Sequence, residues 1–76
     1  SYYREKWYEK AILEYQRVIE EYPRGNKVMA ALLKQGYSFA NLGEKGNARL
    51  ILEELIRKYP QSQEAKSARD KLKALQ

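Results

Sequence analysis

Large or apolar side chains recur every three or four residues at the start of the chain, which is the period of one helix face. These positions are Tyr3, Trp7, Ala11, Tyr15, Val18, Ile19 and Tyr22. No glycine or proline interrupts the series before Pro23, and a proline disfavours helical geometry in the residue before it. The pattern therefore predicts one helix over about residues 2–22, ended by Pro23 and followed by a turn at Gly25 and Asn26.

Capping residues predict where the next helix begins and ends. Asn26 has a side chain that often caps a helix N-terminus, so a second helix is expected from about Asn26 to Leu42. Gly43 supplies the left-handed backbone position that commonly closes a helix.

Two more helices are expected in the second half of the chain. The third runs from about Lys45 or Asn47 to Tyr59, where Pro60 stops it. It should carry two surface ion pairs with favourable four-residue spacing, which are Glu53 with Arg57 and Glu54 with Lys58. Ser62 is expected to cap a fourth helix with a thin apolar stripe. That stripe consists of Ala65, Ala68, Leu72 and Leu75.

The chain repeats itself with an offset of 37 residues. This offset superimposes Tyr22-Pro23 on Tyr59-Pro60. It also superimposes Ala11 on Ala48, Leu13 on Leu50, Ile19 on Ile56, Ala31 on Ala68 and Lys34 on Lys71. Repeats of this length indicate stacked supersecondary units.

Residues of the second and third helices fall on the spacing of the tetratricopeptide signature, so the chain resembles that family. They are Leu32, Gly36, Phe39, Ala48, Leu52, Leu55 and Pro60. Gln35 departs from the pattern because the family usually has an apolar residue there, and Leu55 is larger than the usual alanine. Gly36 and Ala48 are small where two helices are expected to cross closely.

The resemblance implies an all-α fold of antiparallel helix pairs, stacked as a right-handed solenoid fragment of about four helices. One domain is expected over residues 1–76. Within it, residues 1–23 would be the second helix of a truncated repeat, residues 26–60 one nearly complete repeat, and residues 62–76 a capping helix. Terminal units of such stacks need a polar outer face, which the charged fourth helix supplies.

The amino-acid composition excludes most kinds of catalytic site. The chain has no cysteine and no histidine, so it lacks a thiol nucleophile, an imidazole base and the usual zinc ligands. The neighbouring acids Glu20-Glu21 and Glu53-Glu54 are expected on a solvated face, because adjacent helical residues point in different directions. We therefore expect no enzyme, cofactor, metal or small-molecule substrate. No apolar run is long enough for membrane insertion, and the first residues do not resemble a signal peptide.

Charge and the resemblance together predict a binding surface. The net charge is +5, and residues 24–43 carry a charge of +3 with no acid. In the family the first helix of each repeat lines a concave groove, a role that falls here to the second helix. Its groove side, which we call the binding stripe, comprises Lys27, Ala30, Lys34, Tyr37 and Asn41, with Leu33 beside them. Such a surface favours an acidic or amphipathic segment of another protein.

The alternative interpretation is a basic helical module that binds nucleic acid. It is less favoured because basic residues outside the second helix are interspersed with acids, whereas tracking of phosphates needs clustered Lys and Arg on one face. A steep fall of affinity for DNA with salt would distinguish that function from protein binding.

Four aromatic residues lie within the first eight residues, and the repeat pattern expects another helix to precede them. They are Tyr2, Tyr3, Trp7 and Tyr8. Either they are core residues that lack their partner helix, or they form a natural docking surface. In either case they are candidates for a homo-oligomer surface on the N-terminal helix.

Within the family, the segment Tyr8 to Pro23 and its counterpart Asn47 to Pro60 look most like the Tol-Pal-associated proteins that coordinate cell division. The lipoproteins that assemble outer-membrane β-barrels have a similar sequence pattern. Both resemblances imply a periplasmic binding module of the bacterial cell envelope.

Overall fold

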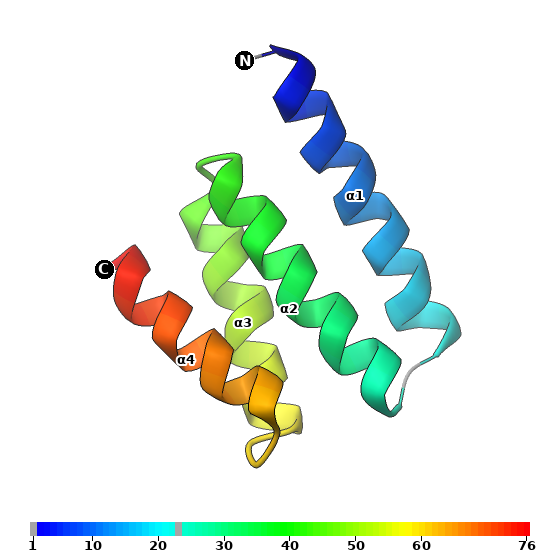
Figure 1. Ribbon diagram of the computed structural model, residues 1–76, viewed down its shortest axis with the longest axis vertical. Helices are drawn as coiled ribbons and strands as arrows, with labels where there is room; N and C mark the ends of the chain where they lie inside the picture. The colour runs from blue at the N-terminus through cyan, green and yellow to red at the C-terminus, as the bar shows by residue number, and fades with distance from the viewer. Residues whose placement is uncertain (1, 23) are drawn as a thin grey trace.

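The computed structural model describes residues 2–22 and 24–76, which form four helices joined by short turns (Figure 1). They are α1 (Tyr2–Glu21), α2 (Asn26–Asn41), α3 (Lys45–Lys58) and α4 (Gln63–Leu75). Within these ranges there is no strand, so the predicted all-α class with four helices is confirmed. Pro23, where a helix break was predicted, lies outside the described residues, as do the side chains of Tyr2 and Tyr3.

The helices form a shallow layer with α2 at its centre (Figure 1). The molecule extends 36 × 31 × 16 Å, and its smallest dimension exceeds the diameter of one helix only modestly. Helix α2 contacts α1, α3 and α4. Among the described residues, α1 contacts no helix except α2, and its first turns project beyond the connection between α2 and α3 (Figure 1).

The start of α2 differs from the sequence prediction. Gly25, not Asn26, occupies the N-cap position, and Asn26 is the first helical residue. The physical reason is the backbone: the turn requires a φ of 96° at the cap, a value that glycine adopts without steric cost. The Gly25 carbonyl accepts the N–H of Met29 at 3.3 Å, which begins the helical hydrogen-bond ladder.

The predicted caps at the other turns are confirmed. Gly43 has a φ of 81° and closes α2, with its N–H donating to the Ala40 carbonyl at 3.0 Å. The next N–H, that of Glu44, donates to the Phe39 carbonyl at 2.9 Å, which completes a Schellman motif. At α4 the Ser62 hydroxyl accepts the N–H of Ala65 at 3.0 Å.

The hydrophobic core lies where α2, α3 and α4 meet. Its buried members are Val28, Leu32, Leu52, Leu55 and Ala68. Gly36 is buried at the crossing of α2 and α3, where a Cβ atom on this residue would lie 2.5 Å from Leu52 Cδ2. Ala48 is fully buried, so the predicted close crossing of the two helices is confirmed. Phe39, also predicted to fill this crossing, is only half-buried.

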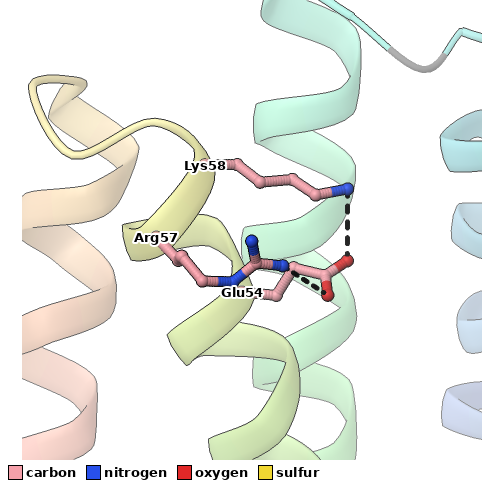
Figure 2. A network of polar contacts seen from close by, with 3 residues as sticks. All are labelled: Glu54, Arg57 and Lys58. Carbon is pink, nitrogen blue, oxygen red and sulfur yellow. Dashed lines mark ion pairs between the residues drawn. The ribbon is translucent and has the colours of Figure 1, made fainter.

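The surface ion pairs of α3 converge on Glu54 (Figure 2). Its carboxylate lies 3.5 Å from Arg57 and 3.6 Å from Lys58. The predicted pair of Arg57 with Glu53 is wrong, since Arg57 pairs with Glu54 instead. On a helix, side chains three positions apart are neighbours just as those four positions apart are. These side chains are exposed, and such pairs contribute about 0.2–1 kcal/mol each.

The crossing of α2 and α3 generates a first testable prediction. Replacing Gly36 with leucine should lower the free energy of unfolding by about 1–3 kcal/mol, because the new side chain meets Leu52. Gly46→Leu is the matched control, since Gly46 is also helical and a Cβ atom there meets nothing within 4 Å. Urea titrations of both variants would measure the difference. Equal stability of the two variants would contradict this packing.

Candidate partner-binding surface

The structure divides the predicted binding stripe between two sides of α2. Lys27, Lys34 and Asn41 are exposed, and Ala30 is half-buried. Leu33 packs against the hydrophobic core and so presents little of its side chain to a partner.

Tyr37 lies towards α4. Its ring centroid is 5.6 Å from the Lys71 ammonium nitrogen, a cation–π contact between α2 and α4. Tyr37 is half-buried, so part of its ring remains exposed.

An open groove of about 320 Å³ runs between α1 and α2. From α2 it is lined by Lys27, Ala30, Ala31 and Lys34, and on the α1 side by Tyr15, Val18 and Tyr22, which directly follows the last residue of α1. We call it the α1–α2 groove. It therefore includes three of the predicted site residues, whereas Leu33, Tyr37 and Asn41 do not line it.

The residues of α1 that line this groove were not among the predicted site residues. Tyr15 and Tyr22 belong to the apolar period that predicts the first helix, but Tyr22 is 46% exposed and Tyr15 is only half-buried. The spacing of Tyr15, Val18 and Tyr22 by three and four residues was the available signal, since it places all three on one face of α1.

Positive charge flanks the apolar floor of the groove. The Lys27 ammonium lies 4.6 Å from the centroid of the Tyr22 ring, so it covers one end of the α1 wall. Lys34 lies one helical turn further along the sequence from Ala30 and is exposed. Because α2 has no acidic residue, this arrangement suits a ligand with apolar side chains and negative charge.

Gln35 fixes α1 to α2 beneath the groove. Its side chain is 2% exposed, and its Nε2 donates to the Ile12 carbonyl and to Gln16 Oε1, both at 3.1 Å. Gln16 in turn donates its Nε2 to the Glu20 carboxylate at 3.2 Å. Because a carboxylate only accepts, this chain of bonds sets the orientation of both amides. Gln35 Oε1 is buried without a hydrogen-bond partner in the part of the chain that the structure describes.

Of the four N-terminal aromatic residues, the structure describes the side chains of Trp7, which is exposed, and Tyr8, which is half-buried. Trp7 is 60% exposed, and its ring meets that of Tyr8 edge-to-face with centroids 4.9 Å apart. Trp7 also borders a second depression of about 310 Å³, which is lined by Trp7, Lys10, Ala11, Glu14 and Tyr15. Tyr15 borders both depressions, so the apolar face of α1 continues from the groove to Trp7.

Residues 2–22 and 24–76 contain neither a cluster of metal ligands nor a membrane-spanning helix. No group of three or more acidic side chains in these ranges is arranged to hold a metal ion. None of their helices combines the length and hydrophobicity needed to cross a membrane.

Comparison with known families found a similarity in the central part of the molecule. Residues 30–62, which cover most of α2 and all of α3, match the family model of the tetratricopeptide repeat. The match supports the presence of a tetratricopeptide repeat in this part of the chain. Repeats of this family are non-catalytic scaffolds for protein interactions. No curated protein and no solved structure matched the chain.

The Gln35 contacts predict how the groove depends on the packing of α1 against α2. Gln35→Ala should lower the free energy of unfolding by about 2–4 kcal/mol, because it removes the bonds to α1 and leaves a cavity. Hydrogen exchange should show the largest loss of protection in α1. Gln35→Met is the control: it keeps most of the volume and removes the unpaired oxygen, so it should cost less than about 1.5 kcal/mol. Equal loss of protection in α1 and α3 would argue against this role.

Proposed function

We propose that this protein is a non-catalytic interaction module that holds a segment of another protein against the exposed side of α2. The single observation that carries the proposal is the acid-free α2, whose exposed Lys27 and Lys34 border an open apolar groove. The tetratricopeptide match over residues 30–62 supports protein binding as the general function.

The charge of this surface supports an acidic or amphipathic partner segment. Lys27 and Lys34 line the groove together with Ala30, and Lys71 of α4 lies beside Tyr37. Complementary potentials raise association rates, and apolar contacts at the centre slow dissociation. We propose that Tyr37 is the apolar anchor, because aromatic residues dominate binding energy at protein interfaces.

The resemblance of the sequence to Tol-Pal-associated and barrel-assembly proteins supports a place in a bacterial envelope complex. We propose the periplasm as the location on that resemblance alone. A parent sequence with a signal peptide and a coiled coil would favour the Tol-Pal relatives, whereas a lipidated N-terminal cysteine would favour the barrel-assembly lipoproteins.

The charge of Lys34 should affect the association rate, and the apolar anchor Tyr37 should affect the dissociation rate. Peptides selected from a displayed library against the immobilised protein would serve as ligands for surface plasmon resonance. Lys34→Glu should slow association about three- to tenfold and weaken its salt dependence, because exposed charges steer encounter. Tyr37→Ala should speed dissociation about tenfold or more, because a buried anchor holds the complex.

Arg49→Glu is the control for the charge change, since Arg49 is exposed on α3 and does not line the groove. Wild-type rates for both Lys34→Glu and Tyr37→Ala, together with loss of binding on substitution of Trp7, would contradict the proposed surface. Selection of nucleic acid rather than peptides, with a steep salt dependence, would favour the alternative function.

We also propose that the exposed end of α1 lets two copies associate. Trp7 is 60% exposed beside Tyr8, and buried aromatic area is a strong driving force for association. In sedimentation experiments at high concentration, the wild-type protein should form dimers and Trp7→Ser should remain monomeric. Leu50→Ser is the matched control, because Leu50 on α3 is 66% exposed and should not affect the dimer. A wild-type protein that stays monomeric would contradict the proposal.

A further inference from the structure

We draw no further inference here: the strongest candidate, the apolar face of α1 that borders the α1–α2 groove, carries nothing, because nothing in the structure shows what covers it.

Discussion

The close crossing of α2 and α3 at Gly36 and Leu52 is the contact on which the rest of the fold depends. The absence of a side chain at Gly36 lets Leu52 reach the backbone of α2, and the approach brings Leu32 and Leu55 into one buried cluster with Ala68 of α4. Helix backbones come this close only where a small residue stands at the contact. This contact sets the orientation of α2. It therefore also sets which side of α2 faces α1 and which side faces solvent.

Because α2 is central, each of its sides has a distinct role. One side is covered by α3 and α4, one holds α1 through Gln35, and the remainder exposes Lys27 and Lys34. The contact with α1 is partly polar, since a buried amide donates to Ile12 and Gln16. Such bonds are directional, so they fix the position of α1 more narrowly than apolar contact would. The width of the α1–α2 groove follows from that position.

The two ends of the helix layer differ in chemistry. At the C-terminal end, α4 has cations such as Arg69 and Lys73 where α2 has the apolar Leu32 and the small Gly36, so the outer face of α4 is charged. At the other end, α1 keeps an apolar face with Tyr15, Val18 and Trp7, which is only partly covered. The described part of α1 is thus the more apolar end of the layer, and the neighbouring α2 is basic.

Local patterns in the sequence determined the helices, the Schellman turn at Gly43, the Ser62 cap and the small residue at the crossing, because each depends on side chains a few positions apart or on the repeat. The Gly25 cap was not predicted, since a cap depends on the backbone angle that the whole connection requires. Only the tertiary structure decided that Leu33 turns to the core, that Gln35 binds α1, and that Tyr15 and Val18 form a groove wall. The physical reason is that the exposure of a helical residue depends on which neighbouring helix covers it, and the period of apolar residues along one helix carries no information about its neighbours.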